Sequence, residues 1–358
     1  MTAKLKFTNL RRSSFFSTVR EKVDNYFQEK DISKHGNTAL WIKASIFLFG
    51  YFLLYILIIS NPFPIPVMLL LAILLGVFSA FIGFNVCHDA MHGSLSANAK
   101  VNKAFSYTFH LVGANPYVWN ISHNIVHHTY TNVAGHDEDI EIAPGLIRLS
   151  KEEKLNKLHR FQHLYAFPLY SLSSLSWLFR KDYKKFFQAK IGQHQAKHPK
   201  IEYFNLFFFK LLYCFIFIGG PLLLTDLSWW QVLIGFFALH FAQGLVMGLV
   251  FQLAHLVEET ALPVPNKDGN IEDAWAEHQM KTTANFSSKS KLASFLLGGL
   301  NRQIEHHLFP KISHIHYPAI SKIIKETAEA YKLPYIENNT FFGALKSHYN
   351  ILKRFSTG

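Results

Sequence analysis

The apolar residues of this chain gather in two long stretches with a polar segment between them. Residues 44–87 contain no charged side chain, and three prolines between positions 62 and 66 divide this stretch. A membrane-spanning helix needs about 20 apolar residues, and proline cannot continue a helix. The first stretch therefore predicts two spanning helices, at about 43–60 and 66–86.

The second apolar stretch predicts another pair of spanning helices, at about 204–224 and 229–254. The short polar turn 225–228 separates them. Trp229 and Trp230 open the later helix, as expected of aromatic residues at a membrane interface. Lys210 interrupts the earlier helix, and we expect its side chain to snorkel towards the membrane surface.

The pattern indicates an all-α integral membrane protein with four transmembrane helices. Residues 1–42 predict a cytoplasmic N-terminal arm, with an amphipathic interfacial helix near 20–29. Residues 43–330 form the predicted membrane domain, and 331–358 a cytoplasmic tail. The polar regions between and after the spans predict a helical cap on one side of the membrane.

Charge predicts the orientation of the four helices. The chain has 36 Lys and Arg against 24 Asp and Glu, a net charge of +12. The two short loops, 61–65 and 225–228, contain no Lys or Arg. Because positive residues stay on the cytoplasmic side, both termini, the middle segment and the cap are predicted to be cytoplasmic.

Composition narrows the function classes further. No nucleic-acid-binding motif accompanies the positive charge, so the lipid bilayer is the predicted anionic partner. The cysteines, Cys87 and Cys214, are too few for a disulfide framework or a cysteine zinc site. The first 40 residues lack the apolar core of a cleavable signal peptide.

Three short histidine-rich strings lie in the predicted cytoplasmic regions. They are His88-Asp-Ala-Met-His92, His123-Asn-Ile-Val-His127-His128 and Gln303-Ile-Glu-His306-His307. Neutral imidazole is the commonest protein metal ligand. With four spans, all three strings fall on the same side of the membrane and can build one site.

The spacing within the strings favours two metal ions. His88 and His92 are four residues apart and share one face of a helix, and His123 and His127 repeat this spacing. Adjacent histidines such as His127 and His128 diverge by about 100° on an α-helix. One ion could hardly bind both, whereas each of two neighbouring ions could take one.

Three further residues are candidates for the site. His255 directly follows the fourth span, at the depth that His88 has after the second, and is a candidate ligand. Gln303 stands where a third histidine of the last string is expected, and is a weak ligand or an orienting group. Asp89 is a candidate acceptor that orients an imidazole. These nitrogen donors suit iron, zinc, copper or nickel.

The three strings resemble the three histidine boxes of the membrane fatty acid desaturases. The strongest resemblance is Gly299-Leu-Asn-Arg-Gln-Ile-Glu-His-His-Leu-Phe-Pro310, supported by Trp119–Asn132 and by Gln279-Met-Lys-Thr-Thr-Ala-Asn285. It extends over about 40–320. Glutamine at position 303 is typical of the front-end and bacterial linoleoyl-CoA desaturase-like group.

The resemblance implies an enzyme that uses O2 and two electrons to insert a cis double bond into the acyl chain of an acyl-CoA or acyl-lipid. It implies two iron ions and the ligands His88, His92, His123, His127, His128, His255, His306 and His307. The sequence has no His-Pro-Gly-Gly haem motif of a fused cytochrome b5. An external ferredoxin or cytochrome b5, with its reductase, is therefore the expected electron donor.

Three alternatives fit parts of the pattern. A membrane di-iron hydroxylase of a lipid, alkane or sterol would share the boxes, although the string that contains Gln303 disfavours it. A metal transporter would place its ligands near the middle of the membrane, whereas these lie outside the spans. A zinc-bound membrane scaffold would use the same ligands without redox chemistry.

Overall fold

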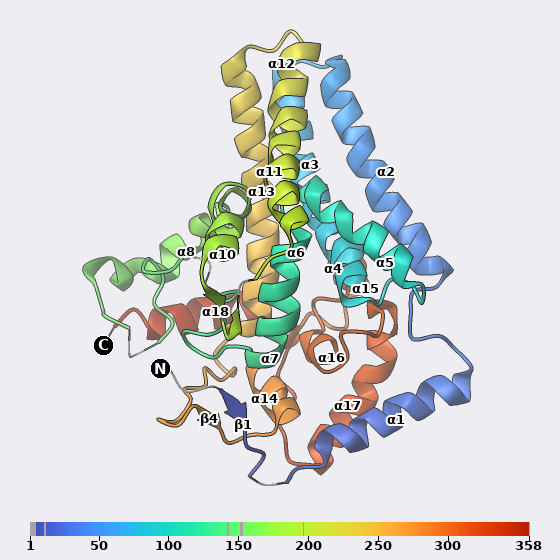
Figure 1. Cartoon of the computed structure of the whole chain (residues 1–358), viewed down its shortest axis with the longest axis vertical. Helices are drawn as coiled ribbons and strands as arrows, with labels where there is room; N and C mark the ends of the chain where they lie inside the picture. Colours follow the sequence, from blue (N-terminus) through green and yellow to red (C-terminus); the bar gives the residue numbers. More distant parts are fainter. Residues whose placement is uncertain (1–4, 11, 142, 151–152, 196, 358) are drawn as a thin grey trace.

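The computed structural model describes residues 5–357 except 11, 142, 151–152 and 196, and these residues are mainly helical (Figure 1). The α-helices are α1 (Phe15–Lys30), α2 (Thr38–Ser60), α3 (Ile65–Ile82), α4 (His88–His92), α5 (Ala99–Ser106), α6 (Pro116–Trp119), α7 (His128–Tyr130), α8 (Gln162–Tyr170), α9 (Ser173–Ser176), α10 (Asp182–Phe187), α11 (Lys200–Cys214), α12 (Gly220–Leu224), α13 (Trp229–His255), α14 (Trp275–Thr282), α15 (Lys291–Leu296), α16 (Gln303–Leu308), α17 (Tyr317–Ala330) and α18 (Phe341–Arg354). The π-helical segments are η1 (Gly83–Cys87), η3 (Asn120–His127), η5 (Trp177–Lys181) and η6 (Phe215–Gly219), and the 3₁₀ segments are η2 (Tyr107–Val112), η4 (Lys157–Phe161) and η7 (His314–His316). The strands form three short pairs, β1 (Lys6–Phe7) with β4 (Asn270–Ile271), β2 (Lys190–Ile191) with β3 (His194–Gln195), and β5 (Asn285–Phe286) with β6 (Glu337–Asn338).

Four helices are long and apolar enough to cross a membrane, which confirms the predicted fold class. They are Thr38–Ser60, Ile65–His92, Lys200–Leu224 and Trp229–His255. The first spanning helix begins at Thr38, earlier than the sequence predicts, because Lys43 and the residues before it continue the same helix. The second predicted span ends too early, because α3 runs through the π-helical η1 into α4 and carries the first histidine string with it.

Local sequence signals set the ends of these helices. The Asn37 side chain accepts a hydrogen bond from the Leu40 amide and caps the start of α2. At the other end Asn61 takes a left-handed conformation, φ 46°, ahead of Pro62. Ser228 and Gln231 form a reciprocal capping box at the start of α13.

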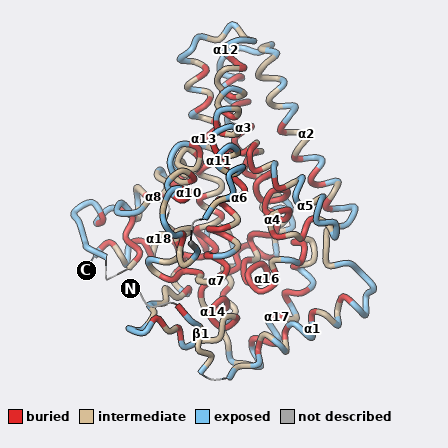
Figure 2. Tube along the Cα trace, viewed as in Figure 1, coloured by how far each residue is buried: buried red, intermediate tan, exposed pale blue. Residues whose placement is uncertain are grey.

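The membrane helices form a stem that stands on a broader cap (Figure 1). Helices α3 and α13 make the most extensive helix–helix packing in the described chain. They approach so closely that a side chain at Gly76 would strike the carbonyl of Leu239 at 2.0 Å. The outer surface of the stem is largely exposed and the cap interior is buried (Figure 2). An apolar exposed stem is the surface expected against lipid.

The cap packs the C-terminal third of the chain beneath the stem. Helix α1 lies along α17 (Figure 1), and its Phe15, Val19, Val23 and Phe27 belong to an apolar core shared with α14, α16 and α17. The predicted amphipathic helix is thus present but longer than expected, and protein covers its apolar side. Its contact with the membrane surface stays a prediction.

Lys210 does not snorkel, in contrast to the sequence prediction. Its side chain is 5% exposed, and its Nζ donates to Asp182 at 2.6 Å and to the carbonyls of Gly113 and Trp177. A buried ammonium is tolerated only when such partners surround it. This ion pair joins α11 of the stem to the start of α10.

Candidate metal centre and substrate cavity

Each histidine string lies on a short helical segment at the junction of stem and cap. The first is α4, which continues the second membrane helix through η1. The second lies on η3 and α7, and the third is α16. π-Helical turns are frequent at functional sites, and here they precede or carry two of the strings. His255 is the last residue of α13.

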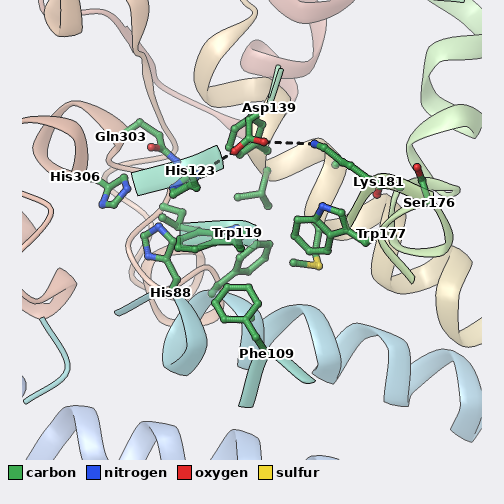
Figure 3. Close-up of a pocket in the computed structure, with 18 residues that line it drawn as sticks. His88, Phe109, Trp119, His123, Asp139, Ser176, Trp177, Lys181, Gln303 and His306 are labelled. Carbon is green, nitrogen blue, oxygen red and sulfur yellow. Dashed lines mark hydrogen bonds and ion pairs between the residues drawn. The ribbon is translucent and has the colours of Figure 1, made fainter. Parts of the chain in front are cut away.

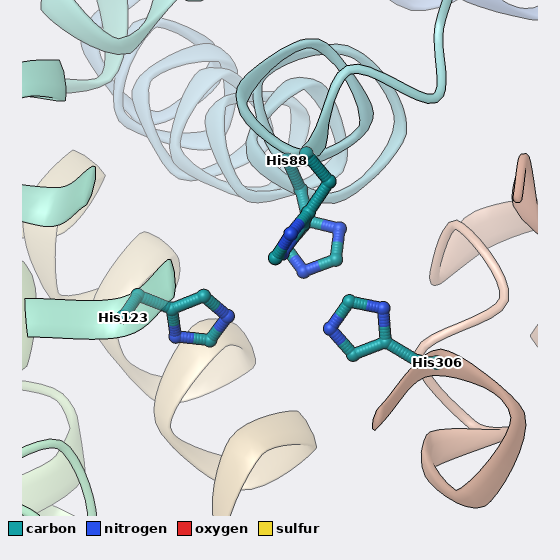
Figure 4. A group of neighbouring side chains, drawn as sticks. His88, His123 and His306 are labelled. Carbon is teal, nitrogen blue, oxygen red and sulfur yellow. The ribbon is translucent and has the colours of Figure 1, made fainter. Parts of the chain in front are cut away.

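The structure brings all eight predicted histidines together. Three groups have potential ligand atoms that lie within 4.8 Å of one another. The groups are His88, His92, His123 and His306; His127, His255 and His307; and His128, His306 and His307. We call the first the outer group, the second the inner group and the third the bridging group. Figure 4 shows rings of the outer group pointing towards a common centre.

The division into groups agrees with the divergence predicted for His127 and His128, but not for the adjacent His306 and His307, which share the bridging group. His127 belongs to the inner group and His128 to the bridging group. His88 and His92 share the outer group, as their spacing predicts. His123 and His127 do not share a group, although an α-helix would place them on one face. The prediction assumed α-helical geometry, and this segment is π-helical up to His127.

The unpaired ring nitrogens of the cluster fit a metal centre. These side chains are buried, yet seven of them have a buried Nε2 with no hydrogen-bond partner among the described residues. The seven are His92, His123, His127, His128, His255, His306 and His307. A buried polar atom without a partner is costly, and a metal ion would satisfy each of these nitrogens.

Hydrogen bonds hold the opposite edge of several rings. Nδ1 of His127 lies 2.8 Å from Asp137, and Nδ1 of His123 lies 3.3 Å from Asp139. Because a carboxylate only accepts, each Nδ1 carries the proton and leaves Nε2 free for a metal. Asp137 and Asp139 come from the loop that follows the second histidine string.

The third string is held by groups from the C-terminal half of the chain. Nδ1 of His307 lies 2.8 Å from Oε1 of Gln279, and Nδ1 of His306 lies 3.2 Å from the hydroxyl of Tyr317. Gln279 begins the segment Gln279–Asn285, which resembles the family, but the sequence predicts no role for it. The sequence around Tyr317 contains no pattern that predicts its contact with His306.

Burial favours the neutral form of three imidazoles of the cluster. It lowers the pKa of His128, His306 and His307 well below the usual value, and the neighbouring histidines lower it further. Burial alone would raise the pKa of Asp139, but Lys185, Lys181 and the hydrogen bond from His123 outweigh it and hold the pKa well below its usual range. Neutral imidazoles with an ionised carboxylate behind one of them are the state that binds a cation.

Asp89 orients a different histidine from the predicted ones. Its Oδ2 accepts a hydrogen bond from Nδ1 of His314 at 2.8 Å, while its Oδ1 is 3.8 Å from Nδ1 of His88. Nε2 of His314 in turn lies 2.9 Å from Nζ of Lys43. His314 is buried and supports the carboxylate beside the first string.

An apolar cavity leads to the outer group (Figure 3). His88, His123, His306 and Gln303 line one end, and Lys181 lies towards the other. Its lining residues between these ends include Phe84, Phe109, Trp119, Trp177, Met247, Val250, Phe251 and Leu300. Gln303 is 3% exposed, and its Oε1 has no partner among the described residues. An acyl chain is the kind of ligand that such a lining accepts.

Comparison with known proteins identifies the family. The sequence profile described as fatty acid desaturase matches residues 62–339. The chain belongs to the fatty acid desaturase family. It is an enzyme, an oxidoreductase that acts on fatty acyl chains.

Similar proteins support this assignment over nearly the whole desaturase. An sn-1 linoleoyl-lipid 6-desaturase of Synechocystis sp. is 34% identical over 98% of this chain and 97% of its own length. An acyl-lipid (8-3)-desaturase of Physcomitrium patens is 33% identical over 98% of this chain and 74% of its own. A probable Delta(5) fatty acid desaturase of Dictyostelium discoideum is 31% identical over 95% and 76%.

Proposed function

We propose that this desaturase inserts a cis double bond into lipid-linked acyl chains, between an existing double bond and the carboxyl end. The proposal rests on one observation. An apolar cavity reaches the outer group, and Gln303 and His306 both line it there (Figure 3). The relatives named above are, by name, linoleoyl-lipid, acyl-lipid and Delta(5) desaturases. These names favour an acyl-lipid substrate over an acyl-CoA. They also favour a double bond on the carboxyl side of an existing one over other positions.

The eight histidines would hold two iron ions. Iron in this site would supply the activation of O2 that breaking unactivated C–H bonds requires, chemistry that no side chain provides. In the overall reaction a –CH2–CH2– unit, O2, two electrons and two protons give –CH=CH– and two waters. Gln303 would bind weakly to the metal or orient a neighbouring ligand.

The protein's own contribution is to position the chain and exclude water. The rings of Phe109, Trp119 and Trp177 line the cavity beside the outer group. They would hold the acyl chain with the reacting methylenes next to His88 and His306. Holding the reacting carbons in one geometry removes much of the entropic barrier of the step.

We further propose that both termini and the site face the cytoplasm. Both ends of the described chain lie on the cap side, away from the two short loops of the stem (Figure 1). Those loops lack Lys and Arg, and the positive-inside rule puts such loops on the far side. A separate ferredoxin or cytochrome b5 would then deliver electrons to the cap.

Heterologous expression tests this function. The full chain is produced with a working reductase and carrier in a host that lacks such enzymes, and linoleoyl lipids are supplied. Gas chromatography should reveal a new double bond on the carboxyl side of the existing ones. A hydroxylated product would favour the hydroxylase alternative, and no product with any supplied acyl chain would refute the proposal.

A further inference from the structure

A second cavity lined by basic residues adjoins the acyl cavity. Arg180, Lys181, Lys184 and Lys185 line it, from η5 and α10. Lys181 and Ser176 line both cavities. A molecule with an apolar chain in the first cavity can therefore place a polar group in the second.

Two cations of this basic cavity are available to a ligand. Arg180 and Lys184 are exposed and four residues apart, and neither side chain has an ion pair or hydrogen bond with another described residue. Lys185 and Lys181 are instead committed to Asp139, at 2.7 and 3.4 Å. Lys181 and Lys185 are thus paired with a carboxylate, whereas the side chains of Arg180 and Lys184 are free to bind a ligand.

Two acidic residues of the same cavity, Glu138 and Glu141, offset part of this charge. Glu138 accepts a hydrogen bond from Gln188 at 3.1 Å. Burial raises the pKa of Glu141, and the nearby Glu153, Glu138 and Asp137 raise it further. Four basic residues and two acidic ones line the cavity, so its lining stays net positive even with both carboxyls ionised.

The basic cavity meets the acyl cavity at the end away from His88 and His306, and a short series of contacts links it to the outer group. Asp139 contacts Lys181 and Lys185 through one oxygen and His123 of the outer group through the other. A single carboxylate therefore separates these ammonium groups from a metal-facing imidazole (Figure 3). The buried ion pair between Lys210 and Asp182 fixes the start of α10 against the stem. The helix that carries Lys184 and Lys185 is therefore fixed in position.

We propose that Arg180 and Lys184 bind the phosphate of the substrate's head group and thereby anchor the carboxyl end of the acyl chain. The proposal rests on the proposed desaturase function. It assigns the ligand as a phosphate ester, which a phospholipid and an acyl-CoA share. An anchor at the opposite end of the acyl cavity holds the carboxyl end at a fixed distance from the outer group, which suits an enzyme that positions its double bond from the carboxyl end. Arg and Lys are the usual partners of phosphate.

The test compares three substrates with the full-length enzyme reconstituted in nanodiscs with iron, carrier and reductase. The probes are linoleoyl phosphatidylglycerol, linoleoyl-CoA and an uncharged linoleoyl galactolipid. The double variant R180Q/K184Q should raise KM about tenfold for a phosphate-bearing probe with kcat retained, because a purely binding contribution is lost. The galactolipid should be unaffected. A rise confined to the phospholipid or to the CoA ester identifies which source the cavity serves.

Controls separate this proposal from folding and from the proposed function. K322Q/K346Q removes two exposed lysines of the cap that line neither cavity, and R180K/K184R should restore KM. Iron content should be unchanged throughout. An unchanged KM for both phosphate-bearing probes, an equal rise for the galactolipid, or a rise in the KM of an acidic electron carrier alone would overturn the anchor. Inactivity of the unmodified enzyme on every probe would instead refute the proposed function.

Discussion

The outer and inner histidine groups differ in what surrounds them. His88, His123 and His306 of the outer group line the acyl cavity, whereas no residue of the inner group does so. The inner residues His127, His255 and His307 are fully buried, and Asp137 and Gln279 hold two of them at 2.8 Å. Nδ1 of the third inner residue, His255, lies 3.4 Å from the Thr282 carbonyl, and the supporting contacts of the outer group are 3.2 and 3.3 Å, so short contacts occur only in the inner group. We infer that the outer position meets substrate and that the inner position is the more rigidly held.

The largest expected effect is loss of the inner group. His307→Ala removes a residue that the inner and bridging groups share, so metal binding and desaturase activity should be abolished together. Metal analysis and product chromatography on the same preparation check this. A matched control is His348→Ala, which removes a buried histidine bonded to Tyr170 and to a backbone carbonyl. It should lower stability and leave metal content intact; full activity in His307→Ala would refute its ligand role.

The carboxylates behind the rings give the next effect. Asp137→Asn should weaken metal affinity by about 10–100-fold, the usual cost of losing such a partner. Asp139→Asn should weaken it less, because its contact with His123 is longer. Competition with a chelator measures both variants. The reverse order would contradict the view that the inner position is the more rigidly held.

Gln303 should affect turnover more than metal content. It lines the cavity next to the outer group, and a neutral amide oxygen is a weaker metal ligand than an imidazole nitrogen. Gln303→Ala should retain both metal ions and lower activity by about tenfold or less. Loss of one metal ion in this variant would instead make Gln303 an essential ligand.

The smallest expected effect is the pH dependence of the stability of the metal-free protein. The pKa values of His128, His306 and His307 are lowered in the folded state. The unfolded chain therefore binds more protons below about pH 6.5. Their contribution to stability is present above that pH and is lost as the pH falls through it. The free energy of unfolding should drop by up to about 1.4 kcal/mol per pH unit for each such histidine. Denaturant unfolding between pH 7 and 5 measures this, and a rise in stability on acidification would contradict it.

The stem and the histidine strings were predictable because both are local signals. A run of about 20 apolar residues is enough to predict a spanning helix, and the predicted and observed bounds differ by a few residues. The strings were visible as spacings of imidazoles. Front-end grouping rested on the single residue Gln303, through resemblance to a family.

The supporting groups were not predictable, because tertiary contacts supply them. Gln279 is 28 residues from His307, and His314 is 225 residues from Asp89. The π-helical form of the second string also lies beyond a pattern that assumes α-helical periodicity. The sequence predicts that Lys210 snorkels, because no pattern in its own segment indicates Asp182 as a partner.

The most direct test of the central claim is the metal content of the site. The full-length protein is reconstituted anaerobically with iron, then counted by metal analysis and examined by Mössbauer spectroscopy. Two irons per chain with a nitrogen-rich environment, both lost in His307→Ala, is the predicted result. A single metal ion per chain, or a redox-silent site that binds zinc alone, would contradict the account.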